Sequence, residues 1–292
     1  MAIPSSGTLA LSAIQTEFGG SNPISMSEYY AGGSNVPSGA TGDSGSIPSS
    51  GAVAVSQFYG STARVAIALT ISSTTQNYNI FANRGGTYSA GISDVTLTVQ
   101  AIVGSTGASG LDTGNQWTSG DTVKIINNSQ IVGRGGAGGA GGGQNAAGSA
   151  GAAAQNAINL GIATTIQNNG GFIRGGGGGG GGGNGTAITT PGGGNKGQVP
   201  STTQYGGGGG GGGQGQQGGA GSSGQAGGQA GSISAAGGGG GSTGANGGSG
   251  GGFGAGGAGS SQAGGAAGKA VNLNGNQITW EDGSGNTQGA VS

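Results

Sequence analysis

The stretch from Gly133 to Gly268 constrains the fold more than any other part of the chain, because it holds 61 of the 83 glycines. It includes unbroken glycine runs at 175–183 and 206–213. Each glycine costs about 1 kcal/mol relative to alanine in a helix, so these runs exclude an α-helix. A pleated sheet is also disfavoured, because glycine has no side chain to pack across strands.

The ordered conformation that is left is the extended threefold helix of the polyproline II type. Such a helix makes no hydrogen bonds to itself, so its N–H and C=O groups must pair with neighbouring helices or with water. Only glycine lets bare backbones approach closely on several sides. The alternative is disorder, because ordering a glycine backbone costs more entropy than ordering any other residue. We adopt the ordered form and predict stacked polyglycine II helices.

Composition argues against several classes of function. Seven basic and eight acidic residues give a net charge of −1, so we expect no binding to nucleic acid. The sequence has no cysteine and no histidine, which removes thiolate chemistry, the commonest general base and the usual metal ligand. We therefore expect no catalytic residue, no metal site and no cofactor. No apolar run is long enough to span a membrane, and Met1–Ala13 lacks the basic start of a signal peptide. We therefore expect no membrane insertion, and release by a route other than export, such as cell lysis.

Residues 1–63 contain an internal repeat, in which Ile3-Pro-Ser-Ser-Gly-Thr-Leu-Ala-Leu-Ser12 returns as Ile47-Pro-Ser-Ser-Gly-Ala-Val-Ala-Val-Ser56. Ser12 and Gln15 have the spacing of a capping box, which predicts a short helix that ends at Gly19. We interpret this region as a module with too small a core to fold alone, which attaches the chain to another protein. The alternative is a spacer. The candidate attachment residues are Ile14, Phe18, Tyr29, Tyr30, Phe58 and Tyr59.

Alternating and β-branched residues predict strands in the region that follows and again at the C-terminus. We expect Trp117 in the core or capping the sheet, and we expect the C-terminal segment to return and pair with the earlier strands. The predicted fold is mainly β with few short helices. Its parts are an N-terminal attachment module (1–63), a β domain (64–132), a polyglycine II domain (133–268) and a C-terminal β segment (269–292).

Polar inserts separate the glycine runs, and we expect antiparallel glycine helices joined by loops at their ends. Loops held on a rigid scaffold are a common form of binding surface. The alternative is that the inserts only connect the helices. The candidate binding residues are Asn184, Thr186, Thr189, Asn195, Lys196, Gln198, Tyr205, Asn246 and Phe253. Of these, Asn246 and Phe253 are expected to lie in one further loop.

Two sequence patterns resemble nucleotide-binding and RNA-binding motifs but lack the context that these motifs need. Gly133-Arg-Gly-Gly-Ala-Gly138 fits the dinucleotide-binding pattern, but that motif needs a helix after it and no helix can follow here. The Arg-Gly-Gly triplets at Arg84, Arg134 and Arg174 lie too far apart to act as a clustered RNA-binding segment.

Several segments resemble the distal tail-fibre adhesins of T-even-like myophages. They are Gly133-Arg-Gly-Gly-Ala-Gly-Gly, Ala147-Gly-Ser-Ala-Gly151 and Ile166-Gln-Asn-Asn-Gly-Gly-Phe-Ile-Arg-Gly, which leads into polyglycine. Separately, Ile3-Pro-Ser-Ser-Gly and Ile14-Gln-Thr-Glu-Phe-Gly-Gly-Ser-Asn-Pro-Ile24 resemble a segment of virion structural proteins of marine and cyanobacterial phages. The distal adhesins lack this repeated N-terminal module, which is a departure from their pattern.

The first resemblance implies a polyglycine II sandwich whose loops contact a bacterial outer-membrane protein or polysaccharide. Our hypothesis is a virion adhesin of the tail or tail fibre, anchored to other fibre proteins by residues 1–63, with the candidate binding residues as its receptor-binding loops. Its oligomeric state is open, with a homotrimer as one option. The first alternative is a structural virion protein without a receptor. A second is an ice-binding glycine-helix protein, against which the irregular inserts argue.

Overall fold

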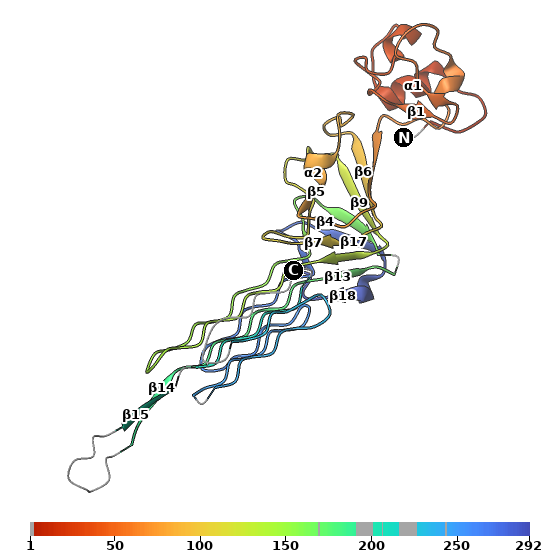
Figure 1. Ribbon diagram of the computed structural model, residues 1–292. Helices are drawn as coiled ribbons and strands as arrows, with labels where there is room; N and C mark the ends of the chain where they lie inside the picture. Colours follow the sequence, from red (N-terminus) through yellow and green to blue (C-terminus); the bar gives the residue numbers. More distant parts are fainter. Residues whose placement is uncertain (1–2, 169, 191–200, 206, 216–226, 243) are drawn as a thin grey trace, which may run out of the picture. The chain divides into compact units, whose positions relative to one another are not determined.

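The computed structural model describes residues 3–168, 170–190, 201–205, 207–215, 227–242 and 244–292 (Figure 1). Strands predominate, and the described part of the chain contains two α-helices, α1 (Leu11–Phe18) and α2 (Ile80–Asn83). This confirms the mainly β fold class. The chain forms two compact units, and the four-part division expected from the sequence stays a prediction. Unit 1 is Met1–Leu69, Phe81–Leu97 and Asn115–Lys124, and unit 2 is Thr70–Ile80, Thr98–Gly114 and Ile125–Ser292.

The chain adds one strand to each of three sheets in turn and then returns to the first sheet. We call one such circuit a coil; β3, β4 and β5 form the first coil. The first sheet has the order β17-β12-β9-β6-β3, the second β18-β13-β10-β7-β4 and the third β16-β11-β8-β5. The pairs β12/β17, β10/β13 and β11/β16 are parallel. The bounds are β3 Val65–Ile71, β4 Thr75–Gln76, β5 Tyr78–Asn79, β6 Ser93–Val99, β7 Val103–Gly104, β8 Leu111–Asp112, β9 Thr122–Asn127, β10 Gln130–Val132, β11 Ile158–Asn159, β12 Thr164–Gln167, β13 Phe172–Arg174, β16 Val271–Asn272, β17 Ile278–Asp282 and β18 Thr287–Gln288.

Aliphatic side chains stack from coil to coil inside these sheets. Ile131 pairs with Ile173 in the second sheet, and in the third sheet Ile158 pairs with Leu111 on one side and with Val271 on the other. All five are fully buried. Parallel in-register pairing places like residues over like, and each buried aliphatic side chain contributes about 1.5–3 kcal/mol. As expected, the C-terminal strands pair with earlier ones and complete the coils.

Amide side chains also stack between coils. Asn127 and Asn168 are buried where the first sheet passes into the second, and Nδ2 of Asn127 donates to Oδ1 of Asn168 at 2.8 Å. On the third sheet, Asn159 donates to a carboxylate oxygen of Asp112 at 3.0 Å and accepts from Nδ2 of Asn272 at 2.9 Å. A buried polar group must be hydrogen-bonded to be tolerated, so these ladders fix the register of the coils.

The glycine-rich residues enter as two insertions between the second and third sheets. In the first coil Asn77 alone connects β4 to β5, and in the second coil residues 105–110 connect β7 to β8. In the next two coils the same connections are residues 133–157 and 175–270. We call the described residues of these two insertions the glycine block. Figure 1 shows its extended segments side by side, with the antiparallel hairpin of β14 (Thr186–Thr190) and β15 (Ser201–Tyr205) beyond them.

Backbone hydrogen bonds between these segments recur at every third residue. One row joins the two insertions, with donor–acceptor distances of 2.8 or 2.9 Å. A period of three residues is that of the extended threefold helix. The N–H groups of Gly133, Gly136, Gly139 and Gly142 donate in turn to the carbonyl oxygens of Arg174, Gly177, Gly180 and Gly183.

The run Gly175–Gly183 lies at the centre of the block. From residue 176 onward, its N–H groups donate in rotation to the segments 146–155, 208–214 and 255–258. Its carbonyl groups accept in rotation from 133–142, 248–251 and 265–268. Neighbours therefore surround the run on six sides, some parallel to it and some antiparallel, where the sequence predicted antiparallel helices alone. A Cβ at Gly179 would lie 1.9 Å from the carbonyl oxygen of Ala137, so the run has no room for side chains.

The outer segment 133–142 carries other residues at every third position. Segment 133–142 has Arg134, Ala137 and Ala140, which are half-buried or exposed, while Gly136 and Gly139 between them are buried. A helix with three residues per turn presents one residue per turn to the outside. The spacing of the non-glycine residues therefore marks an outer segment, a signal that the sequence analysis overlooked.

The N-terminal part of unit 1 has a hydrophobic cluster of its own, so its core is larger than the sequence suggested. Ile14 and Phe18 share the buried face of α1, and Gly19 ends the helix with a φ of 80°, as predicted. The predicted cap at Ser12 is wrong. The helix begins at Leu11, without a side-chain cap, because Leu11 packs against the cluster and fixes the first turn. The cluster is Ile3, Ile14, Phe18, Tyr29, Val36, Ala40, Ile47 and Phe58.

The two copies of the repeat brace each other. Tyr30 follows the 3₁₀-helix η1 (Met26–Tyr29) and donates its hydroxyl to the carbonyl oxygen of Gly51 in the second copy. Tyr59 follows η2 (Val55–Phe58) and donates to the carbonyl oxygen of Gly7 in the first copy. Gly7 and Gly51 hold the same place in the repeat, and both have a positive φ that favours glycine. The short hairpin of β1 (Thr41–Gly42) and β2 (Gly45–Ser46) lies between the copies in sequence.

An aromatic cluster and one carboxylate organise the loops of unit 1 that precede β6 and β9. Phe81 and Tyr88 contact Trp117 edge-to-face, with ring centroids 4.8 and 5.9 Å apart, so Trp117 is half-buried in these loops. The guanidinium of Arg84 lies 3.5 Å from the ring centroid of Phe81. Asp121 accepts hydrogen bonds from the Tyr88 hydroxyl at 2.6 Å and from the backbone N–H groups of Gly91, Ser93 and Thr118.

The first prediction tests the packing of the glycine block. Gly179→Ala should destabilise unit 2 by about 3 kcal/mol, because the new methyl group meets backbone on a side where nothing can yield. Gly241→Ala is the matched control. A Cβ there meets nothing within 4 Å, so the change should stay within about 0.5 kcal/mol. Thermal unfolding of both variants is the measurement, and equal melting temperatures would contradict the packing.

The second prediction concerns Asp121. Burial alone raises the pKa of this carboxyl, but hydrogen bonds from Tyr88, Thr118, Ser93 and Gly91 together bring the pKa below its ordinary value of 3.8. The ionised form therefore stabilises unit 1 above pH 3.8, and this contribution is lost as the pH falls through the lower folded-state pKa. Asp121→Asn should cost about 1–3 kcal/mol at pH 7 and less at pH 3. Chemical denaturation at both pH values tests this, and an equal cost at both would refute it.

Candidate functional site

The glycine block has two ends that differ in what they offer to a ligand. At the strand end, its segments join β10, β11, β13 and β16. At the far end, its segments turn at 143–146, at 259–262 and between Ser242 and Asn246, and the central run continues through 184–185 into the β14–β15 hairpin. All of these segments belong to unit 2. The far end therefore gathers turns that are distant in sequence.

Asn184 ties neighbouring segments together at the far end. Its Oδ1 atom accepts hydrogen bonds from the backbone N–H of Gly148 at 3.0 Å and from Nε2 of Gln262 at 3.2 Å. The side chain of Asn246 accepts from the N–H of Ser242 at 2.9 Å, and Ser260 donates its hydroxyl to the carbonyl oxygen of Asn246. The turn at 259–262 thus bridges Asn184 and Asn246, and the structure brings these two candidate residues together.

The hairpin carries three further candidates. Thr186 is exposed at its base, where it pairs with Tyr205, and Thr189 pairs with Thr202 further along. Asn195, Lys196 and Gln198 lie outside the described residues. The hairpin continues from the central glycine run, so its base is held by the best-packed part of the block.

Phe253 lies at the opposite end from Asn246, although the sequence grouped the two in one further loop. The segment between them runs antiparallel to the central run, with N–H groups of Gly248 and Gly251 donating to Gly181 and Gly178. Phe253 consequently sits at the strand end, where its ring centroid is 5.2 Å from the guanidinium of Arg174. A loop assignment from composition does not say at which end of a helix the loop lies.

The candidate attachment residues have two kinds of environment. Ile14, Phe18, Tyr29 and Phe58 form part of the hydrophobic cluster, and burial, followed by the nearby Glu28 carboxylate, raises the pKa of Tyr29. Tyr30 and Tyr59 are half-buried, and their hydroxyls brace the repeat. All six therefore hold the module together, and any direct contact with another protein is made by the outer residues of the module.

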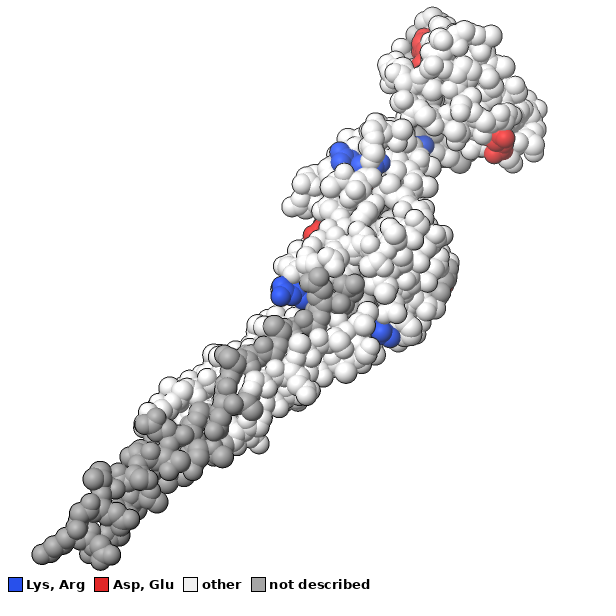
Figure 2. Space-filling view, viewed as in Figure 1, with Lys and Arg blue, Asp and Glu red and all other residues white. Residues whose placement is uncertain are grey.

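The surface of the far end is polar and uncharged. Its described turns and the two hairpin strands include no lysine, arginine, aspartate or glutamate. Figure 2 shows that charged side chains are sparse over the visible face of the molecule as well. Recognition by these residues would use amide, hydroxyl and backbone groups, whose strength depends on geometry and on exclusion of water.

The described residues contain neither a metal-binding group nor a membrane-spanning helix. No group of three or more histidine, cysteine, aspartate or glutamate residues lies in an arrangement that could hold a metal ion. Among the helices in the described ranges, none is long and apolar enough to cross a membrane.

Comparison with solved structures shows a related fold. The chain matches the crystal structure of the gp37-gp38 adhesin tip complex of the bacteriophage S16 long tail fiber, with a TM-score of 0.52 and 24% sequence identity. The match covers 82% of this chain and 86% of that chain. No curated protein sequence matches the chain.

The sequence model of the phage tail fibre adhesin Gp38 family matches residues 66–292. This range begins within β3, includes the whole glycine block and leaves the N-terminal module outside. It confirms the resemblance to distal tail-fibre adhesins that the sequence indicated. Membership places the protein in the tail of a phage virion, in a family whose role is adhesion. This chain belongs to the phage tail fibre adhesin Gp38 family.

Proposed function

We propose that this tail fibre adhesin binds a receptor on the bacterial surface through the far end of its glycine block. The observation that carries the proposal is the convergence of turns from separate segments around Asn184 and Asn246, held by hydrogen bonds between the turns. A binding surface needs side chains fixed on a rigid support, and the block supplies both. The receptor is a surface protein or polysaccharide.

The β14–β15 hairpin is the second element of this surface. Backbone pairing from Thr186↔Tyr205 to Thr190↔Ser201 fixes its register, so candidate residues beyond the strands are presented on a defined base. Binding at a single far end is expected to be weak, because it involves few side chains and no charge among the described residues. Several fibres on one virion would multiply weak contacts into stable attachment.

The N-terminal module joins the adhesin to another fibre protein. The family match begins only at residue 66, so this module is added to the part that the family shares. The related solved structure is a complex with gp37, which supports a fibre protein as the partner. A homotrimer is a further option for the assembly. After host lysis the protein is extracellular as part of the virion.

A structural role without a receptor is the alternative. It predicts that the far end is covered by other virion proteins and that changes there alter assembly. Receptor binding predicts that changes at the far end leave assembly intact and reduce adsorption. The two are separable in intact virions.

The third prediction tests the hairpin. Replacing residues 189–202 with Asn-Gly keeps the pairs up to Ile188↔Thr203 and closes them with a two-residue turn. Adsorption of virions to host cells should fall about tenfold, which corresponds to a loss of about 1.4 kcal/mol in binding. The melting temperature should stay within about 2 °C of the wild type. Gly107→Ala, at a position where a Cβ meets nothing within 4 Å, is the control and should adsorb normally. Unchanged adsorption of the hairpin variant would rule out the hairpin as a receptor site.

The fourth prediction tests the N-terminal module. Virions produced with a chain that lacks residues 1–62 should carry about tenfold less adhesin per particle, because the attachment contacts are gone. Immunoblotting of purified virions measures this, with the hairpin variant as the control that should be incorporated normally. Normal incorporation of the truncated chain would show that attachment lies elsewhere.

A further inference from the structure

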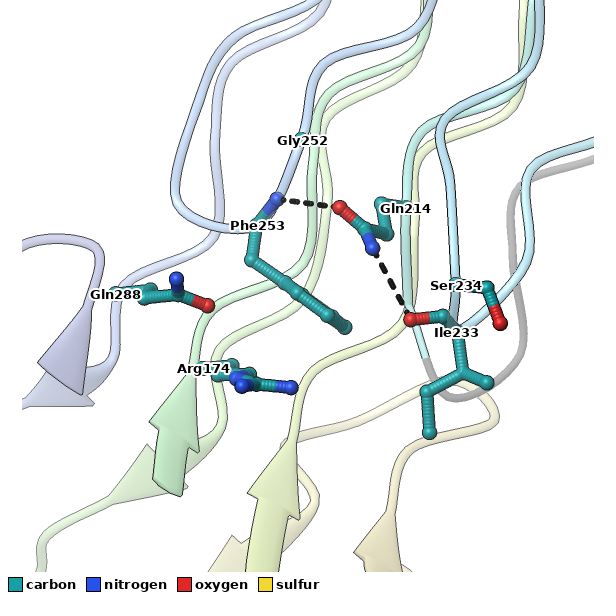
Figure 3. Close-up of a pocket in the computed structure, with 7 residues that line it drawn as sticks. All are labelled: Arg174, Gln214, Ile233, Ser234, Gly252, Phe253 and Gln288. Atoms are coloured by element: carbon teal, nitrogen blue, oxygen red, sulfur yellow. Dashed lines mark hydrogen bonds between the residues drawn. The ribbon is translucent and has the colours of Figure 1, made fainter. Parts of the chain in front are cut away.

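A pocket of about 450 Å³ lies at the strand end of the glycine block, opposite to the proposed receptor surface. Figure 3 shows that it lies among the end of β13, the turn at Phe253 and the turn at Ile233 and Ser234. Gln288, the last residue of β18, completes one side. The pocket thus forms where strands and glycine segments meet, and all of its lining belongs to unit 2.

Gln214 fixes the shape of this pocket. Its Oε1 atom accepts from the N–H of Phe253 at 3.2 Å, and its Nε2 atom donates to the carbonyl oxygen of Ile233 at 3.0 Å. One amide therefore clamps the two turns that form the opposite walls (Figure 3). On the strand side, Gly175 donates its N–H to the carbonyl oxygen of Gln288 at 2.8 Å. The walls are built before any ligand arrives, which lowers the cost of binding.

Arg174 supplies a positive charge that the described residues leave uncompensated. Its guanidinium carbon lies 4.1 Å from the ring centroid of Phe172 and 5.2 Å from that of Phe253. Nη1 donates to Oε1 of Gln130 at 3.3 Å, whereas Nε is buried without a hydrogen-bond partner among the described residues. Burial lowers the pKa of Arg174, but an arginine keeps its charge at neutral pH. No carboxylate of the described residues forms an ion pair with it.

Holding a cation partly out of water without a counter-ion is costly, and a ligand that supplies an anion would reduce this cost. The planar guanidinium matches a carboxylate best, because it can donate two parallel hydrogen bonds. The half-buried ring of Phe253 adds an apolar face, and the amide of Gln288 and hydroxyl of Ser234 add hydrogen-bonding groups. A carboxylate, a ring with one apolar face and several hydroxyls describe an acidic sugar.

We propose that this pocket binds one carboxylate-bearing sugar residue, with Arg174 holding the carboxylate and Phe253 packing against the sugar ring. The volume lies in the range of pockets that enclose small ligands. This inference rests on the proposed adhesin function and adds a second contact, to an acidic surface polysaccharide, at the end of the block away from the hairpin.

The test compares two probes that share a ring and differ in one group, methyl β-D-glucuronide and methyl β-D-glucoside. With the full-length protein, saturation-transfer NMR titrations should give about tenfold tighter binding of the glucuronide. Arg174→Gln should bring the two affinities close together. Phe253→Leu should weaken both. Equal binding of the two probes by the wild type, or no binding of either, overturns the proposal.

Arg134→Gln is the matched control. Arg134 follows β10 much as Arg174 ends β13, and it also begins an Arg-Gly-Gly triplet, but its guanidinium donates to the carbonyl oxygen of Thr106 and is outside the pocket lining. This variant should keep the preference for the glucuronide. Thermal unfolding identifies any variant that fails to fold. If Arg174→Gln does not fold, the weaker binding of both probes by Phe253→Leu still tests the pocket. A preference that survives in a folded Arg174→Gln variant also overturns the proposal.

The hairpin variant separates this inference from the proposed receptor surface. It should bind the glucuronide like the wild type, because the pocket lies at the other end of the block. Normal adsorption of that variant, together with glucuronide binding, would refute the hairpin as a receptor site and support the pocket as a binding site. Reduced adsorption of the hairpin variant, with no binding of the glucuronide by the wild type, would support the hairpin as a receptor site and refute the pocket as a binding site.

Discussion

The hydrogen bonds between extended glycine segments are the interaction on which the structure of unit 2 depends. A segment of this kind bonds only to its neighbours, so each one is stable only within the block. The donors and acceptors of Gly175–Gly183 are divided among six neighbours, and removing one of them would leave buried polar groups without partners. Glycine is required for this geometry because a Cβ would collide with a backbone carbonyl oxygen of a neighbouring segment, as at Gly179, where it would meet that of Ala137.

The parallel coils supply what an isolated glycine block lacks, which is a fixed starting register. β10 and β13 pair in parallel up to Val132↔Arg174, and the next bond, from Gly133 to Arg174, already belongs to the row with a three-residue period. The ladder of the sheet therefore passes directly into the ladder of the block. Both spacings are set by backbone hydrogen bonds, so little distortion is needed at the junction. Arg174 stands at this junction and lines the pocket there.

The sequence predicted the parts of the structure that depend on local chemistry. The glycine runs ruled out helix and pleated sheet, alternation located the strands, and the positions of Ile14, Phe18 and Gly19 gave α1 its buried face and its end. It predicted that the C-terminal segment pairs with earlier strands, but not the direction of that pairing or the other features decided by distant partners. Parallel pairing of Ile158 with Leu111 and Val271 joins segments far apart in the chain, and Ser12 lost its role as a cap because Leu11 packs on the cluster. Composition placed Asn246 and Phe253 in one further loop, but only the direction of the segment between them shows which end of the block each occupies.

The packing of the block also determines at which positions the sequence of such an adhesin can vary. A substitution inside the central run meets backbone at once, and an outer segment accepts small residues at one position in three, as at Ala137 and Ala140. An outward position can also carry a large side chain, as at Arg134, and the turns are not limited to one such position in three. The turns at the far end contribute few of the rows of backbone bonds, so residues there can differ without disturbing the scaffold. Recognition and stability are thus carried by separate residues, which allows binding specificity to alter while the backbone packing stays the same.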